Sequence, residues 1–230
     1  MFNPGPQASL QQQLMTGMAY GQQGMLAEQQ GNLMGAAQMY DQAAGVIRQS
    51  IANAQSWNVF VPDGVHAALA EACACEARVL NAVGNGAMAW QCLNLALAEL
   101  NQAIALNPGA APYHLGAGTL LMSMGNLPEA ERAFSTAAQL APQDPTAQSM
   151  VMTVRSLRGA VGAPMSVPQA MPATPFAPVG TGAPAPGAQP QGGANWANTI
   201  KDVCGALDAV FKTMNNGMTT FDNAQNYFGE

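Results

Sequence analysis

Charged residues are scarce in this chain. They make up 9% of its 230 residues, against about 25% in an average soluble protein. Lysine occurs only twice, at Lys201 and Lys212, and the net charge is −6. Phosphate contacts require a basic patch, so this composition argues against nucleic-acid binding. A surface with so little charge also does little to oppose self-association.

Long apolar runs and a recognisable export signal are also missing. No uninterrupted apolar stretch approaches the ~20 residues that a membrane helix needs, so we expect no membrane span. The N-terminus, Met1-Phe2-Asn3-Pro4, lacks a basic segment followed by an apolar one. This predicts a cytoplasmic protein and leaves export by another route open.

The cysteines give no sign of a metal site. The chain has four: Cys73, Cys75, Cys92 and Cys204. On a helix, Cys73 and Cys75 would point about 200° apart, which does not suit a shared metal. We interpret the cysteines as small buried hydrophobic residues in a reducing compartment, with disulfide pairing as the alternative.

The sequence also lacks the patterns of known catalytic sites. It has no Ser-His-Asp arrangement, HExxH motif or phosphate-binding glycine loop. His66 lies seven residues before Cys73, but a third and a fourth ligand are not evident. Glu71 and Glu76 are interpreted as a solvated edge rather than an acid–base pair. We therefore predict that the protein is not an enzyme and holds no cofactor or metal.

One spacing recurs over the first two thirds of the chain. The pattern Ala96-x3-Leu100-x2-Ala103-x4-Pro108 returns 34 residues later as Ala130-x3-Phe134-x2-Ala137-x4-Pro142. An earlier copy, Gly31-Asn32-Leu33 followed by Ala36-x3-Tyr40-x2-Ala43, matches the segment that begins at Gly125. A repeat of this length with small residues at fixed places predicts stacked helical hairpins, an all-α fold. Such arrays offer binding or assembly surfaces rather than catalytic pockets.

Apolar periodicity places three hairpins and a capping helix in residues 8–158. The hairpins are expected at 8–30 with 33–54, at 65–83 with 87–106, and within 111–144, and the cap at 145–158. A frame counted back from Pro108 would instead start the middle repeat at Ala77, but it crosses the breaker Gly84-Asn85-Gly86. Residues 57–64 form an extended connector. Its Trp57 and Phe60 either contact a partner or cover a core edge.

The last third of the chain changes character twice. Residues 159–193 are rich in Pro, Gly and Ala, which predicts a disordered linker. Residues 194–228 predict an amphipathic helix that must dock on this chain, on a partner or on a second copy. Its apolar stripe consists of Trp196, Ile200, Val203, Leu207, Val210, Met214, Met218 and Phe221.

Residues 10–158 resemble the tetratricopeptide repeat family, most specifically in the first and third repeats. Tyr20 and His114 stand where the family often has tryptophan. The resemblance implies a right-handed superhelix of about three helical hairpins. Its concave groove would be lined by the first helix of each pair, and members of the family mostly bind proteins.

Mapped onto this chain, the groove residues implied by the resemblance are Met18, Gly21, Met25, Glu28 and Gln29 in the first repeat and Leu115, Thr119, Met122 and Ser123 in the third. None is the Lys or Arg with which some members hold a peptide's terminal carboxylate. The groove is therefore expected to be apolar and rich in methionine, and to suit an apolar segment. The alternative is that several of these methionines belong to the core.

These observations predict a non-enzymatic protein-interaction scaffold that associates with itself. The alternatives are a structural subunit of an oligomer or filament, and a chaperone-like adaptor for an apolar partner segment. The expected partners are further copies of the chain or an apolar helix of another protein.

Overall fold

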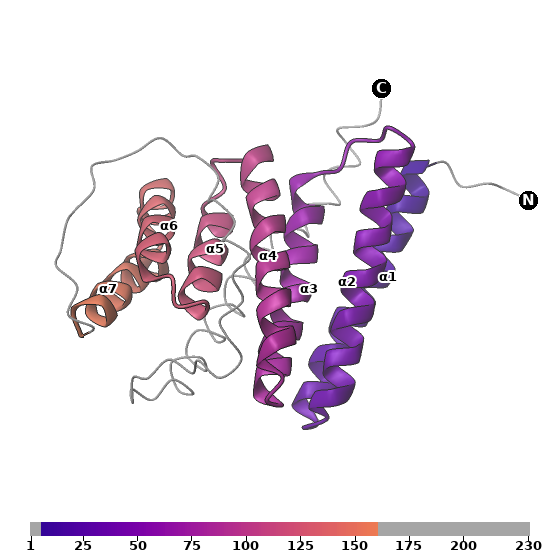
Figure 1. Ribbon diagram of the computed structural model, residues 1–230. Coiled ribbons are helices and arrows are strands. Elements are labelled where there is room, and N and C mark those ends of the chain that lie inside the picture. The colour runs from indigo at the N-terminus through magenta and orange to yellow at the C-terminus, as the bar shows by residue number, and fades with distance from the viewer. Residues whose placement is uncertain (1–5, 161–230) are drawn as a thin grey trace, which may run out of the picture. The chain divides into compact units, whose positions relative to one another are not determined.

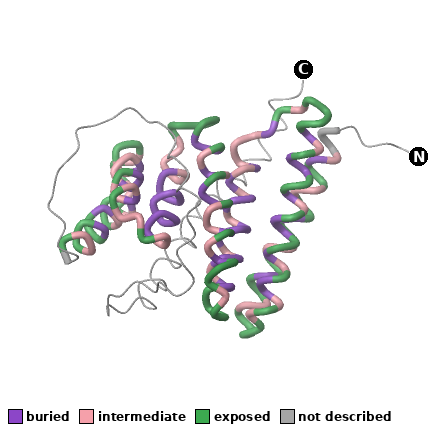
Figure 2. Tube along the Cα trace, viewed as in Figure 1, coloured by how far each residue is buried: buried purple, intermediate pink, exposed green. Residues whose placement is uncertain are grey.

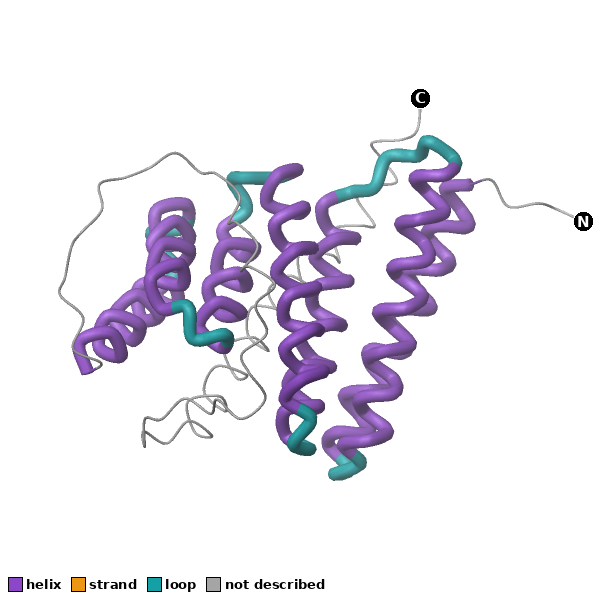
Figure 3. The backbone as a smooth tube through the Cα atoms, in the orientation of Figure 1, coloured by secondary structure: helices purple, strands orange, loops and turns teal. Residues whose placement is uncertain are grey.

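The computed structural model describes residues 6–160, which form seven helices and no strand (Figures 1 and 3). The helices are α1 (Pro6–Gln29), α2 (Leu33–Ser56), α3 (Asp63–Ala82), α4 (Gly86–Leu106), α5 (Ala111–Ser123), α6 (Leu127–Leu140) and α7 (Pro145–Ala160). The all-α prediction and the three expected hairpins are confirmed. The preferred boundaries of the middle repeat are also right. Most of the predicted linker and all of the predicted C-terminal helix lie outside the described residues.

The described residues divide into two compact units. The first unit (residues 6–107) holds α1 to α4, and the second unit (residues 108–160) holds α5 to α7. Within each unit, helices that follow one another in the chain pack side by side. Buried positions alternate with exposed ones along α2 and with intermediate ones along most of α3 in Figure 2. None of the described helices is long and apolar enough to cross a membrane.

The hairpin turns share a glycine followed by an asparagine. Gly31, Gly84 and Gly125 have φ values of 77°, 83° and 76°, a region that is strained for residues with a side chain. The next residue is the N-cap of the following helix in each case. In the first two turns, the asparagine side chain accepts a hydrogen bond from the backbone three residues on. The Gly-Asn pair therefore ends one helix and begins the next.

The two arms of the first and last hairpins meet at a glycine and an aromatic ring. A Cβ atom added at Gly24 would lie 2.8 Å from the ring of Tyr40, and one at Gly118 would lie 2.7 Å from the ring of Phe134. Both rings are buried. These two pairs occupy the same repeat positions, 94 residues apart, so the predicted repeat frame is confirmed at this helix contact.

The middle hairpin is longer than the last one on both arms. α3 has 20 residues against 13 in α5, and α4 has 21 against 14 in α6. Buried alanines in α4 recur every seven residues, at Ala89, Ala96 and Ala103. Seven residues are about two helical turns, so the extra length returns to the same helix face. This explains why the middle repeat does not fit a 34-residue frame.

Candidate functional site

One face of α1 is exposed and carries no charge. Met15, Met18, Met25 and Leu26 expose 68%, 36%, 49% and 54% of their surface. At about 100° per residue, they lie on one stripe with three exposed glutamines. We call this stripe the α1 surface; it consists of Gln11, Met15, Met18, Gln22, Met25, Leu26 and Gln29. Such a run of exposed apolar side chains is a candidate protein-binding surface.

Packing on α2 fixes the direction of the α1 surface. A Cβ added at Gly17 would lie 2.6 Å from the Ile47 side chain, and Gly24 lies against the Tyr40 ring. Leu10 is buried as well. These contacts occupy the opposite side of α1, so the methionines are left on the free side of the helix.

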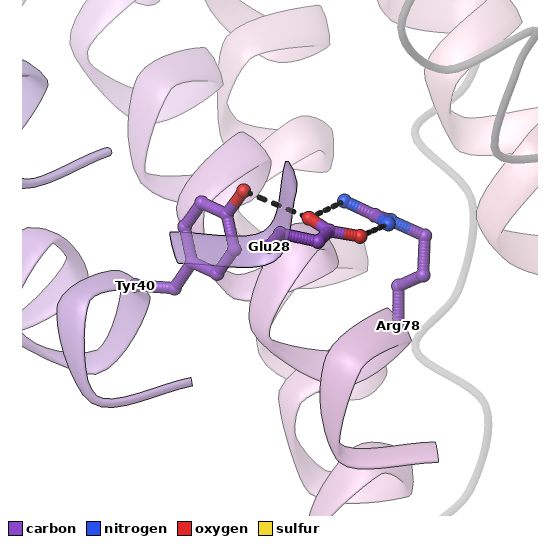
Figure 4. A network of polar contacts seen from close by, with 3 residues as sticks. All are labelled: Glu28, Tyr40 and Arg78. Atoms are coloured by element: carbon purple, nitrogen blue, oxygen red, sulfur yellow. Dashed lines mark hydrogen bonds and ion pairs between the residues drawn. The ribbon is translucent and has the colours of Figure 1, made fainter. Parts of the chain in front are cut away.

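Glu28 ties α1 to two other helices instead of facing a ligand (Figure 4). The Tyr40 hydroxyl donates a hydrogen bond of 3.2 Å to Glu28 Oε2. The Arg78 guanidinium donates to both carboxylate oxygens, with an Nη2–Oε2 distance of 2.7 Å. Burial, together with Cys75 and Glu28 nearby, raises the pKa of Tyr40 far above its usual range. This predicted groove residue is therefore part of the internal structure of the first unit.

The predicted groove residues of α5 are not exposed. Leu115, Thr119 and Met122 are buried, within a run from His114 to Met122 in which every residue is buried. The Thr119 hydroxyl donates to the Leu115 carbonyl, and half-buried Ser123 donates to that of Thr119. The expectation that these three buried side chains line an open groove is wrong. α5 carries apolar residues around its whole circumference, and a helix of this kind is normally surrounded by other parts of the protein.

The connector between α2 and α3 presents two exposed aromatic side chains. Trp57 and Phe60 are exposed by 44% and 71%, so Phe60 does not cover a core edge. Asn58 has a φ of 55°, and the Asn58 and Val59 amides donate to the Gln55 and Ala54 carbonyls. This pair of hydrogen bonds is a Schellman motif. The motif fixes the backbone that carries Trp57. The role of Trp57 and Phe60 as partner contacts stays a prediction.

A polar cluster lies where α2, α3 and α4 meet, and it is built around Glu76. Burial and then the Asp41 carboxylate raise the pKa of Glu76, while the Cys92 thiol and Arg48 oppose this more weakly. Glu76 is buried, so its interpretation as a solvated edge is wrong. The sequence signal was misleading because the groups around Glu76 come from other helices.

The buried thiols of this cluster are unreactive. Burial raises the pKa of Cys73 and of Cys92 to about 12, so both stay protonated at neutral pH. His66 Nδ1 lies 2.8 Å from Glu99 Oε2. Among the residues that the structure describes, no three His, Cys, Asp or Glu side chains gather as metal ligands would. Cys73 and Cys92 are buried and outside any disulfide, as interpreted, whereas Cys75 is half-buried and Cys204 lies outside the described residues.

A shallow cleft of about 410 Å³ lies between α1 and α2. It is lined by Ser9, Gln12, Gln13, Thr16, Val46 and Gln49. Its lining carries no charge and only one apolar side chain. It offers hydrogen-bonding groups but no acidic or basic side chain.

The residues that the sequence grouped in one groove thus differ in their exposure to solvent. Met18, Met25 and Gln29 lie on the α1 surface, and Gly21 beside them is half-buried. Met15 and Leu26 belong to the same surface but were missed, because the repeat alignment pointed only to groove positions. A plot of residue angle around α1 would have found them. The predicted contact residues of the C-terminal segment, from Trp196 to Phe221, lie outside the described residues.

The second half of the described chain matches a known family. Residues 93–152 match the family model described as tetratricopeptide repeat, so the resemblance noted in the sequence is confirmed over these residues. The match spans the end of the middle hairpin, the whole last hairpin and part of α7. No curated protein matches the chain.

Proposed function

We propose that this chain, whose residues 93–152 match the tetratricopeptide repeat family model, is a protein-interaction scaffold whose α1 surface binds an apolar helix. Proteins with these repeats are interaction scaffolds and are generally not enzymes. The absence of catalysis in this chain and its cytoplasmic location are parts of the proposal.

The observation that carries the proposal is the exposed, uncharged α1 surface. Four large apolar side chains are exposed there over about 17 Å of helix, because Met15 and Leu26 are 11 residues apart. Methionine side chains are flexible and adapt to partners of varied shape. An amphipathic helix would bury its apolar stripe against them.

The chain's own C-terminal segment is the first candidate ligand. Its apolar stripe from Trp196 to Phe221 repeats at helical spacing, and the 35 residues before it, 159–193, are predicted from their composition to form a linker. A flexible linker of that length spans roughly 30–35 Å, which permits docking within the chain or on a neighbour. The small number of charges favours a neighbouring copy. Exchange of segments would give a closed ring or a filament, and the chain would then be a structural subunit.

Peptide binding tests the α1 surface directly. The probe is a labelled synthetic peptide of residues 194–228, titrated onto the full-length chain with Leu207→Asp and Val210→Asp. We expect Met18→Glu to weaken binding about tenfold or more, because the partner's apolar face would have to desolvate a carboxylate. The matched control is Met152→Glu, at an exposed methionine of α7. Equal affinity for both variants would rule out the α1 surface.

Light scattering of the full-length chain tests the segment as a connector. We expect assembly into species larger than a dimer to be lost when residues 190–230 are deleted and when Leu207→Asp is combined with Val210→Asp. Larger assemblies that survive both changes exclude the segment and leave contacts between repeats as the mode of association.

A further inference from the structure

The order of side chains on the α1 surface is nearly the same in both directions. Counted from position 20, Gln11 lies nine residues before it and Gln29 nine residues after it. Met15 and Met25 are each five residues from that position, and Met18 and Gln22 are each two residues from it. All six are exposed. A surface with such a pattern is complementary to itself when a second copy runs antiparallel.

We propose that two copies of this chain pair through antiparallel α1 helices centred near residue 20. The pairing sets Met15 against Met25 of the second copy and Gln11 against Gln29 of the second copy, each contact being made twice. This arrangement is isologous, so it closes as a dimer. The inference rests on the proposed function, since it names a partner for the same surface.

The chemistry of each pair supports a second copy as the occupant. Methionine pairs bury apolar surface with flexible side chains, and a glutamine amide both donates and accepts, so two glutamines can hydrogen-bond to each other. Identical surfaces that carry charge repel each other when like charges meet. The α1 surface has none, and Glu28, the only charged residue of α1, is held by Arg78.

The size of the α1 surface sets the strength of the pairing. Gln11 and Gln29 are about 27 Å apart along the helix, and a helix is about 10 Å wide. The resulting contact area, about 270 Å² per copy, is well below the ~800 Å² of a standard stable interface. We therefore expect a weak dimer that dissociates on dilution.

Introducing charges at the paired methionines tests both the contact and the antiparallel direction of the two helices. The background is the full-length chain with Leu207→Asp and Val210→Asp, and sedimentation equilibrium gives the dimer dissociation constant. Met15→Glu with Met25→Glu places like charges together in both contacts, and we expect the dimer to weaken at least about tenfold. Met15→Glu with Met25→Lys places opposite charges together and should restore dimerisation. Met152→Glu is the control and should leave the constant unchanged.

Three outcomes would overturn the inference. One is a chain that stays monomeric at every accessible concentration. Another is a dimer that tolerates both glutamates. The last is a Glu–Lys variant as weak as the Glu–Glu variant, which indicates parallel pairing. Circular dichroism confirms that each variant keeps its helices. A monomer that still binds the 194–228 peptide through Met18 would reject the dimer and leave the proposed function standing.

Discussion

The first and the last hairpin use the same repeat positions for opposite purposes. Met25 in α1 and Thr119 in α5 are equivalent, 94 residues apart, yet Met25 is half exposed and Thr119 is fully buried. The contacts within each hairpin are alike, since a glycine of the first helix meets an aromatic ring of the second in both. The repeat thus fixes the hairpin, while the remaining faces of its first helix are free to become surface or core.

A polar pair in the first hairpin is replaced by an apolar pair in the last. Tyr40 and Glu28 are hydrogen-bonded, and their equivalents are Phe134 and Met122. A buried polar group that has lost its hydrogen-bond partner destabilises the fold, whereas replacing both partners by apolar groups changes the stability little. We therefore expect the two positions to change together. Arg78 from α3 completes the polar version in the first unit.

Overpacking should have the largest effect on both hairpins. Ala36 and Ala130 are fully buried at the same repeat position, and Ala36→Leu and Ala130→Leu should each cost roughly 1–3 kcal/mol of stability. Hydrogen exchange should show the loss of protection in the first unit for one variant and in the second unit for the other. Unchanged thermal midpoints in both variants would contradict the shared repeat frame.

Replacing Glu28 by methionine, the residue at the equivalent position 122, should destabilise the first unit less than Ala36→Leu does. Glu28→Met removes hydrogen bonds to Tyr40 and Arg78 in a partly buried setting, so we expect a loss of about 1–2 kcal/mol of stability. Denaturant unfolding of Glu28→Met, Tyr40→Phe and the double variant measures the coupling between them. Additive effects in this cycle would mean that the polar pair does not act as a pair.

One buried carboxyl, Glu76, and one half-buried carboxyl, Glu131, should give the units opposite responses to pH. The pKa of Glu76 is raised above 4.5, so its contribution to stability is present below that value and is lost as pH rises through the folded pKa. Burial alone would raise the pKa of Glu131, but hydrogen bonds from Arg155 and Arg158 outweigh it and lower the pKa. The contribution of Glu131 is therefore present above pH 4.5 and is lost as pH falls through the lowered pKa.

Thermal midpoints of Glu76→Gln and Glu131→Gln at about pH 4 and about pH 7 measure this contrast. Relative to the parent, Glu76→Gln should gain stability at the higher pH, whereas Glu131→Gln should lose it there. Glu71→Gln, on the same helix as Glu76, is the control. Shifts of the same sign in both variants would contradict the opposite pKa directions.

Salt should have the smallest effect. The α1 surface has no charge for ions to screen, so its binding to the 194–228 peptide should change little between low and physiological ionic strength. The matched comparison is Met18→Lys, which introduces a charge that salt can screen. A tenfold loss of affinity for the parent would show that charged residues elsewhere carry the binding.

The hairpins could be predicted from the sequence because their turns are formed by residues that are neighbours in the chain. The site could be predicted only in part, because its contacts join residues that are far apart in the chain. The glycine and asparagine of each turn are neighbours, so Gly31-Asn32 and Gly125-Asn126 marked helix ends without further information. Arg78 reaches Glu28 from 50 residues away, and no spacing rule connects them. The burial of Glu76 depends on α2 and α4, and the exposure of Met25 depends on the absence of a covering helix within its unit.

The seven-residue recurrence in α4 bears on how such hairpins vary in length during evolution. Ala96 follows Ala89 and precedes Ala103 at equal intervals on one buried face. An insertion or deletion of seven residues in both arms therefore changes the length of the hairpin by two turns and preserves its packing pattern. Changes of one or two residues would rotate every later side chain away from its neighbour, so hairpins of this kind are expected to diverge in steps of a heptad.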